Sequence, residues 1–484
     1  MAFGLLAFGA YLPRLRLQRR AIADTHGWFN ASLKSLAKGE RTMANWDEDA
    51  VTMAVEAARD ALGSRAREAV KSLRFVSTTA PFLDRLNAAV VCEALALAPQ
   101  TRASDAAGSQ RAATSALLEA LEARSTTLVV AADKRPTLAA SAFEMICGDG
   151  AAALLVGEGE PVARLIGSAT RTADFVDHYR TLEQPTDYQW EERWIRDAGY
   201  AALVPPVVRE ALATAGLEPA QVSRFILPSV VARVAPAMAK ACGLPETSVA
   251  DLLTAQCGDT GVAHPLVLLV RALEEASPGE RILVVGFGQG VDALVFEVMP
   301  AITSVERGRG VSGHLARRRA EPNYAKFLSF NDTIALERGM RAEADKLTPL
   351  SALWRNREAV TSLIGGRCTQ CDTRQFPRTR LCVNPACGGL DTQAPEPFAE
   401  KLGQVNSYTA DRLTYSPDPP ACYGMIQFAE GGRWMMDFTD VDEADLEVGQ
   451  TMRMMFRIKD FDPQRGFRRY FWKAAPTGAA QARV

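Results

Sequence analysis

The sequence lacks an excess of either charge and lacks any long hydrophobic run. Its 55 lysines and arginines nearly balance its 57 aspartates and glutamates, so no overall field attracts nucleic acid or an acidic membrane surface. The apolar opening at residues 1–10 is too short to span a bilayer and has no basic segment before it, which predicts a buried strand. We therefore expect a cytoplasmic protein that binds neither nucleic acid nor membrane.

Histidine is also scarce. The chain of 484 residues contains only His26, His178, His264 and His314, which limits the candidates for acid–base chemistry near neutral pH. Five of the nine cysteines stand singly, a pattern typical of a reducing compartment: Cys92, Cys147, Cys242, Cys257 and Cys422. The length and the hydrophobic fraction of 48% predict two or three domains with ordinary cores.

The other four cysteines form two close pairs. Cys368 and Cys371 are separated by two residues, Cys382 and Cys387 by four, and ten residues lie between the pairs. This spacing lets four thiolates converge on one tetrahedral Zn²⁺, with glycines beside both pairs to form the tight turns. Four thiolates leave no open coordination position for a substrate, so the sequence predicts a structural zinc site.

The first 300 residues alternate short apolar runs with helical patterns. Buried strands are predicted at 126–133 and 151–156, and helices at 46–62 and 110–123. This alternation predicts an α/β architecture. The segment 281–298 repeats the plan of 128–156, two strands around a glycine-rich turn, which indicates a duplicated fold.

The rest of the chain changes character twice. We expect a connector with an arginine-rich stretch and a helical lead-in at 301–345, and a zinc ribbon at 346–395. Residues 396–484 alternate apolar and polar positions in five short segments (403–409, 423–428, 433–438, 452–457 and 469–473). Five strands bounded by Gly, Pro and Asp are typical of an OB-fold barrel.

Two resemblances follow from these motifs. Residues 324–476, with the cysteine pairs and Gln-Phe-Pro-Arg at 375–378, resemble the rubredoxin-like zinc-ribbon/OB-fold family that accompanies thiolase-fold proteins. Residues 1–300 resemble the 3-hydroxy-3-methylglutaryl-CoA synthase branch of the thiolase superfamily, through Gly-Ala-Tyr-Leu-Pro at 9–13, Gly-Asp-Gly-Ala-Ala-Ala at 148–153 and Gly-Phe-Gly-Gln-Gly at 286–290. The resemblance implies a duplicated thiolase fold, acyl-CoA substrates and a homodimer.

The chain departs from that family at the residues that carry its chemistry. Family synthases use a cysteine nucleophile at a helix N-terminus, where the helix dipole lowers the thiol pKa. Alignment with this motif places Gln110 at the cysteine, Ile226 at a histidine and Asp259 at an asparagine. The three departures agree, so we expect no mechanism through an acyl-cysteine.

Several residues remain as candidates for the chemistry. His264, in a Gly-Val-Ala-His-Pro loop similar to the Gly-His-Pro loop of thiolases, is predicted to act as an acid or base; the alternative is an inert histidine that caps the next helix. Asp259 would act as a base or orient His264, or else is an ordinary turn residue. Ser109 and Gln110 mark the helix start and are both candidate catalytic residues. Gln110 can place an amide where the thiolate would have been, and the alternative for Ser109 is that it is only an N-cap. Cys257 is a possible replacement nucleophile or a small buried hydrophobe.

Outside this loop, the candidates are weaker. Arg307, Arg309 and Arg317 could contact the phosphates of coenzyme A, although a solvated connector would also carry such arginines. Tyr188 and Tyr200 could serve as phenolic acids or could simply pack.

Two functions of different classes fit this sequence. The first is an enzyme that makes or cleaves a C–C bond in an acyl-CoA, as thiolase-like aldolases and acyltransferases do, without the usual cysteine nucleophile. The second is a non-catalytic partner that binds acyl-CoA and scaffolds a separate, active thiolase subunit. Binding of nucleic acid by the ribbon is disfavoured because the OB-like segment has no strong basic excess.

Overall fold

The computed structural model describes residues 2–342 and 349–478, and these divide into two compact units. The first unit comprises Met1–Asn45, Asp49–Cys92 and Leu97–Asn331. The second comprises Trp46–Glu48, Glu93–Ala96 and Asp332–Val484. The first unit therefore extends past residue 300 into the predicted connector: α10 (Gly310–Ala316), β14 (Arg319–Glu321) and α11 (Tyr324–Phe330) all belong to it. Part of the connector and the start of the predicted ribbon, at 343–348, lie outside the described residues.

A nine-stranded sheet forms the centre of the first unit, in the order β11-β12-β13-β8-β1-β7-β6-β4-β5. Its strands are β1 (Ala2–Tyr11), β4 (Ser72–Val76), β5 (Arg102–Ala106), β6 (Thr127–Asp133), β7 (Gly150–Gly159), β8 (Ala163–Thr172), β11 (Arg224–Ile226), β12 (Arg281–Phe287) and β13 (Gly290–Val298). The apolar opening of the chain is thus a buried strand, β1, as predicted.

The sheet consists of two halves with the same plan. In one half, β6 pairs parallel to β4 and antiparallel to β7, which pairs antiparallel to β1. In the other, β12 pairs parallel to β11 and antiparallel to β13, which pairs antiparallel to β8. A bridge from Leu5 to Ala163 joins β1 to β8. The repeat at 128–156 and 281–298 therefore corresponds to two equivalent hairpins, which confirms the predicted duplication.

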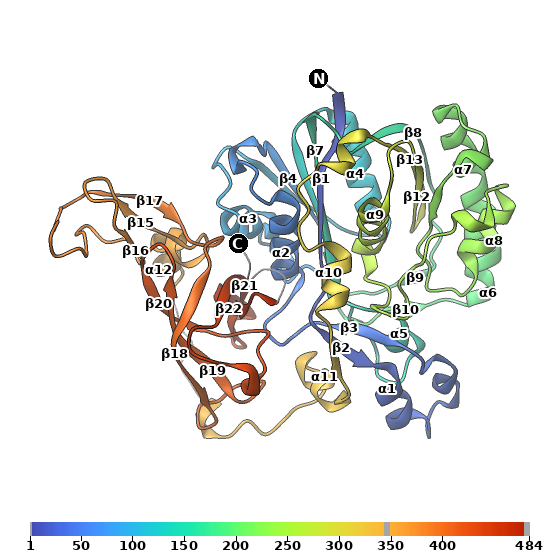
Figure 1. Cartoon of the computed structure of the whole chain (residues 1–484). Coiled ribbons are helices and arrows are strands. Elements are labelled where there is room, and N and C mark those ends of the chain that lie inside the picture. Colours follow the sequence, from blue (N-terminus) through green and yellow to red (C-terminus); the bar gives the residue numbers. More distant parts are fainter. Residues whose placement is uncertain (1, 343–348, 479–484) are drawn as a thin grey trace. The chain divides into compact units, whose positions relative to one another are not determined.

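Helices cover both faces of this sheet (Figure 1). α4 (Ala112–Ala123) and α9 (His264–Glu275) contact each other and strands of both halves, and they share one apolar core. α2 (Ala50–Leu62) packs on β1 and β7, and α7 (Ala201–Ala215) packs on β8 and β13. The N-terminal ends of α4 and α9 are therefore positioned by the duplicated core.

The helix predicted at 46–62 begins at Ala50. Asp49 accepts a hydrogen bond from the Thr52 amide at 3.0 Å, and its own amide donates to the Thr52 hydroxyl at 2.8 Å. This reciprocal capping box fixes the start of α2, because it satisfies amides that have no partner within the helix. Residues 46–48 instead pack within the second unit.

Smaller elements complete the first unit. β2 (Leu15–Gln18) lies between β3 (Glu40–Met43) and β14, and β9 (His178–Tyr179) pairs with β10 (Tyr188–Gln189) as a short hairpin. Its other α-helices are α1 (Arg19–His26), α5 (Ala142–Ile146), α6 (Glu192–Trp194) and α8 (Val234–Ala241), together with α3 (Asn87–Ala94) up to Cys92. Among the described residues of the whole chain, no helix is long and apolar enough to cross a bilayer.

The second unit contains a ribbon and a barrel. The ribbon sheet joins β16 (Arg374–Gln375), β15 (Ile364–Cys368) and β17 (Gln393–Pro397), after α12 (Leu350–Arg355) and α13 (Arg357–Val360). The five segments predicted as strands form one antiparallel sheet in the order β20-β19-β18-β21-β22: β18 (Gly403–Asp411), β19 (Ala421–Phe428), β20 (Arg433–Asp437), β21 (Thr451–Asp462) and β22 (Phe467–Pro476). A parallel bridge from Phe438 to Ala474 brings the two edges together, which gives the OB-like closure.

Candidate functional site

The start of α4 is fixed by Ser109. Its hydroxyl donates to the Gly288 carbonyl at 2.8 Å and accepts from the Arg111 amide at 3.1 Å. A side chain at Gly288 would place a Cβ atom 2.6 Å from this hydroxyl, so only glycine allows the contact. The Ser109 hydroxyl thus joins the helix start to the glycine loop at 286–290. The N-cap residue of α4 is Arg111 and no side chain caps the helix, so Ser109 orients the segment before α4 and is not its cap; its catalytic role stays a prediction.

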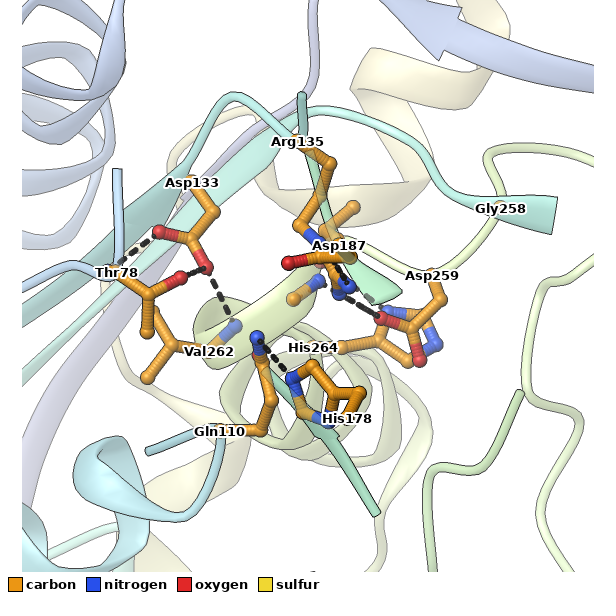
Figure 2. A network of polar contacts seen from close by, with 12 residues as sticks. Thr78, Gln110, Asp133, Arg135, His178, Asp187, Gly258, Asp259, Val262 and His264 are labelled. Atoms are coloured by element: carbon orange, nitrogen blue, oxygen red, sulfur yellow. Dashed lines mark hydrogen bonds and ion pairs between the residues drawn. The ribbon is translucent and has the colours of Figure 1, made fainter. Parts of the chain in front are cut away.

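Gln110 points its amide toward a histidine that the sequence analysis did not assign. Nε2 of Gln110 lies 3.5 Å from Nε2 of His178, which belongs to the β9–β10 hairpin (Figure 2). On the other side of the ring, Nδ1 of His178 lies 2.8 Å from the Asp177 carboxylate. The second oxygen of Asp177 accepts from the Gln289 side chain at 3.2 Å. The amide, the imidazole and the carboxylate therefore form one continuous polar chain.

A buried group of opposite charges lies beside this chain in the first unit. Arg135 contacts Asp187 through Nε at 3.0 Å and Asp259 through Nη1 at 3.3 Å (Figure 2). Arg180 also contacts Asp187, at 2.6 Å. Burial alone would raise the pKa of Asp187, but the charges of Arg135 and Arg180 outweigh burial and lower it. The ion pairs fix β10 of the hairpin, and Arg180 also donates to the Thr78 carbonyl.

Asp133, at the end of β6, is a second anchor. Its carboxylate accepts from the Thr78 amide at 2.8 Å, from the Thr78 and Thr79 hydroxyls, and from the Val262 amide at 2.9 Å. These bonds join the loop after β4 to the turn that precedes α9 (Figure 2). A signal for both anchors was present in the sequence, since Asp133 ends a fully buried strand and Arg135 lies two residues after it.

Asp259 and His264 lie on this turn but do not meet. Oδ1 of Asp259 accepts from Arg135 and from the Gly261 amide at 2.8 Å. His264 is buried, with Nδ1 3.2 Å from the Thr260 hydroxyl and Nε2 3.1 Å from the Leu252 carbonyl. Burial lowers the pKa of His264, so the neutral ring is favoured. Both ring nitrogens face protein groups, an arrangement typical of the alternative of a histidine at the start of α9; the catalytic roles of His264 and Asp259 stay predictions.

The free cysteines of the first unit near the site are poor nucleophiles. Cys257 is fully buried, its thiol donates to the Gly258 carbonyl at 3.2 Å, and burial raises its pKa to about 12. Burial likewise raises the pKa of Cys147 to about 11. Because the thiolate is the reactive form, these surroundings favour the interpretation of Cys257 as a small hydrophobe.

We predict that Cys257 in the folded protein resists alkylation. At pH 8 a thiol of pKa about 12 is ionised in about one molecule in ten thousand, so iodoacetamide should modify it only after denaturation. Peptide mass spectrometry of native and guanidinium-unfolded samples measures this directly. The half-buried Cys92 provides an internal comparison, and rapid labelling of native Cys257 would show that its thiolate is accessible.

The remaining candidates lie apart from this site or within its packing. Arg307 donates to the Glu274 and Ile302 carbonyls, and Arg317 donates to Nδ1 of His314 at 3.0 Å. The main-chain amide of Arg309 donates to Asp60. Binding of coenzyme A phosphates by these arginines stays a prediction.

The two tyrosines differ in their surroundings. Tyr188 is exposed and lies against Tyr179, with ring centroids 5.6 Å apart. Tyr200 is buried and stacks on Phe287 at 3.9 Å, and burial raises its pKa. A raised phenol pKa keeps Tyr200 protonated, and its contacts are those of a packed core residue.

The four clustered cysteines fit a zinc ion. Their sulfur atoms all lie within 4.8 Å of one another, with 3.8 Å between Cys368 and Cys387 and 3.6 Å between Cys371 and Cys382. A tetrahedral ion with Zn–S bonds of about 2.3 Å requires sulfur separations of about 3.8 Å. The Thr392 hydroxyl lies 3.2 Å from the Cys368 sulfur, where it can donate to a thiolate. The donor set supports structural zinc.

Comparisons with known proteins find matches in both units. The family model "3-oxoacyl-[acyl-carrier-protein (ACP)] synthase III C terminal" matches residues 212–297, and "ChsH2, rubredoxin-like zinc ribbon domain" matches 357–393. A hydroxymethylglutaryl-CoA synthase of Aeropyrum pernix is 29% identical over 347 residues, covering 69% of this chain and 96% of that protein. One from Pyrococcus furiosus is 27% identical over 307 residues, covering 61% and 86%.

Solved structures show the same fold. An HMG-CoA synthase complexed with CoA superimposes with a TM-score of 0.59 at 17% identity, covering 72% of this chain and 93% of that one. The 3-oxoacyl-(acyl carrier protein) synthase III of Pseudomonas aeruginosa gives a TM-score of 0.55 at 19% identity, covering 62% and 99%. The protein therefore carries a duplicated thiolase-like domain. Its sequence is similar to those of hydroxymethylglutaryl-CoA synthases, and the same chain carries a segment that matches the ChsH2 zinc ribbon model and an OB-like barrel.

Proposed function

We propose that the protein acts on a coenzyme A thioester and makes or cleaves a C–C bond in the acyl group without a covalent acyl-cysteine. The observation that carries the proposal is Gln110, which places a neutral amide at the start of α4, where the resembling synthases have their cysteine. An amide cannot form an acyl-enzyme, but it can hydrogen-bond a thioester oxygen as negative charge develops there. The two buried thiols nearby, Cys147 and Cys257, are both poor substitutes.

The similarity to synthases whose structures hold coenzyme A or its thioesters supports the substrate class. A thiolase-like domain, a zinc ribbon and an OB-like barrel in one chain also fit an acyl-CoA enzyme of the aldolase or thiolase type. In this proposal the zinc is structural and takes no part in the reaction. We further expect a homodimer in the reducing cytoplasm.

The proposal is tested by offering the purified protein matched CoA thioesters. We expect a 3-hydroxyacyl-CoA or a 3-oxoacyl-CoA with free CoA to give a shortened acyl-CoA, detected by mass spectrometry of the thioester pool. Gln110→Ala should slow this conversion, whereas Ser64→Ala, at an exposed residue outside the site, should leave it unchanged. Absence of any C–C bond change with every thioester would contradict the proposal and favour the non-catalytic partner.

A further inference from the structure

The geometry points to His178 as the acid–base group of this site, oriented by Asp177, and to a 3-hydroxyacyl thioester as the compound it acts on. This inference rests on the proposed function and deepens it by naming the substrate class. Of the four histidines, His178 is the one whose ring faces Gln110, which lies two residues before α4.

The Asp177 carboxylate fixes the tautomer of the His178 ring. A carboxylate accepts but does not donate, so the proton of the 2.8 Å contact resides on Nδ1 of His178. Nε2 then keeps its lone pair and faces Gln110 at 3.5 Å. Asp177 is itself held by Gln289, on the glycine loop that also receives the Ser109 hydroxyl. Asp177 and Gln289 are thus positioning residues.

The hairpin that carries His178 is fixed from its other strand. Asp187, which directly precedes β10, is almost fully buried between Arg135 and Arg180. The side chain of His178 retains 15% of its exposure, and that of Asp177 13%. The imidazole is therefore rigidly placed yet still accessible to a ligand, the combination that proton transfer requires.

A buried acceptor without a partner and a histidine lone pair in a long contact select the substrate. Oε1 of Gln110 is buried and has no hydrogen-bond partner among the described residues. The Nε2 lone pair of His178 accepts only the long, 3.5 Å contact from the Gln110 amide, which a bound hydroxyl can replace. An unsatisfied buried acceptor is costly, and a bound hydroxyl would remove that cost by donating. A 3-hydroxyacyl thioester carries such a donor, whereas a 3-oxoacyl or unsubstituted acyl thioester does not.

The corresponding step is a retro-aldol cleavage that balances without a further reactant. Nε2 of His178 removes the proton of the 3-hydroxyl, and the O–H electrons form a C=O bond. The C2–C3 bond breaks, and its electrons pass into the enolate of the shortened thioester. The imidazolium then returns the same proton to C2, so the products are a carbonyl compound and a shortened acyl-CoA. The reverse steps describe aldol addition.

The test compares wild type with His178→Gln and Asp177→Asn. With 3-hydroxybutyryl-CoA and 3-hydroxypalmitoyl-CoA as probes, we expect His178→Gln to lower kcat by about 10²–10⁴-fold, the usual contribution of a general base. Asp177→Asn should lower kcat less, with little change in KM. It should also lower the population of the Nδ1–H tautomer of His178, which ¹⁵N NMR measures. A loss of stability alone would not change this population. Tyr179→Phe, at an exposed neighbour on the same hairpin, is the matched control and should leave kcat unchanged.

A binding experiment separates this inference from the proposed function. Wild type should bind each 3-hydroxyacyl-CoA roughly tenfold or more tightly than the unsubstituted acyl-CoA of equal length, and His178→Gln should lose that preference. If wild type cleaves the thioester and His178→Gln cleaves it equally fast, the inference is overturned while the proposed function stands. If no thioester is cleaved, the proposed function falls. In that case, equal affinities of wild type for the hydroxylated and unsubstituted thioesters would also overturn the proposed recognition of the 3-hydroxyl by His178. A preference for the hydroxylated thioester that disappears in His178→Gln would support that recognition.

Discussion

Replacing Cys382 by serine is expected to remove zinc and unfold the ribbon. Four converging thiolates bind structural zinc with an apparent free energy of roughly 10–16 kcal/mol, and that binding energy is also local folding energy. The ribbon sheet of the second unit has only three short strands, so few other contacts hold it. Metal analysis should show about one zinc per chain for wild type and a large loss for the variant. Hydrogen exchange at Ile364–Cys368 should accelerate strongly.

A matched control is available within the same unit. Cys422→Ser changes a half-buried cysteine of β19 outside the cluster, so it should keep full zinc and a protected ribbon. Full zinc content in Cys382→Ser together with unchanged exchange would contradict the assignment of the four ligands.

Replacing Arg135 by methionine is expected to destabilise the first unit by about 3–5 kcal/mol. Arg135 is almost fully buried, and its removal leaves Asp259 without an ionic partner and Asp187 with Arg180 alone. The cost of an uncompensated buried carboxylate, rather than the loss of a contact, accounts for this magnitude. Chemical denaturation, monitored through the hydrogen exchange of the β6 amides, measures this loss of stability. Arg164→Met breaks a half-exposed pair with Glu297 and should cost less than about 1 kcal/mol.

The ion pair between Arg135 and Asp187 makes the stability of the protein depend on pH in a definite direction. The pKa of Asp187 is lower in the folded state than in the unfolded chain, so the pair stabilises the protein above the unfolded pKa of about 4. That stability is lost as the pH falls through the folded pKa. Wild type should therefore lose more stability than Arg135→Met between neutral pH and about pH 3. Parallel pH profiles for the two proteins would contradict the account.

Much of the architecture could be predicted from the sequence because strong patterns encode it. The strand at 127–133 is apolar from Leu128 to Ala132 and buried along its whole length, which only a covered sheet explains. Alternation predicted all five strands of the barrel. The four zinc ligands follow from cysteine spacing, which tertiary context rarely alters. The predicted start of α2 was too early. The apolar Trp46 continues the helical pattern toward the N-terminus, but the capping box at Asp49 makes the helix begin at Ala50.

The candidate site was harder to predict because its parts are distant in the sequence. Gln110 and His178 are 68 residues apart, and β9 is only two residues long, so no periodicity marks the position of His178. His264 was favoured through a loop resemblance, whereas its burial depends on how α9 packs into a core shared by both halves of the sheet. Loop motifs predict which residues begin a helix, but only the packed fold decides which side chains remain accessible.

The intact mass of the protein after exposure to acetyl-CoA and an acid quench tests the central claim most directly. With no thiol at the start of α4 and with Cys147 and Cys257 protonated by burial, we predict an unmodified chain, while the same preparation still converts a 3-hydroxyacyl-CoA. An added acetyl group that maps to Cys257 or Ser109 and forms as fast as turnover would contradict the account. The protein would then be a transferase that works through a covalent acyl-enzyme.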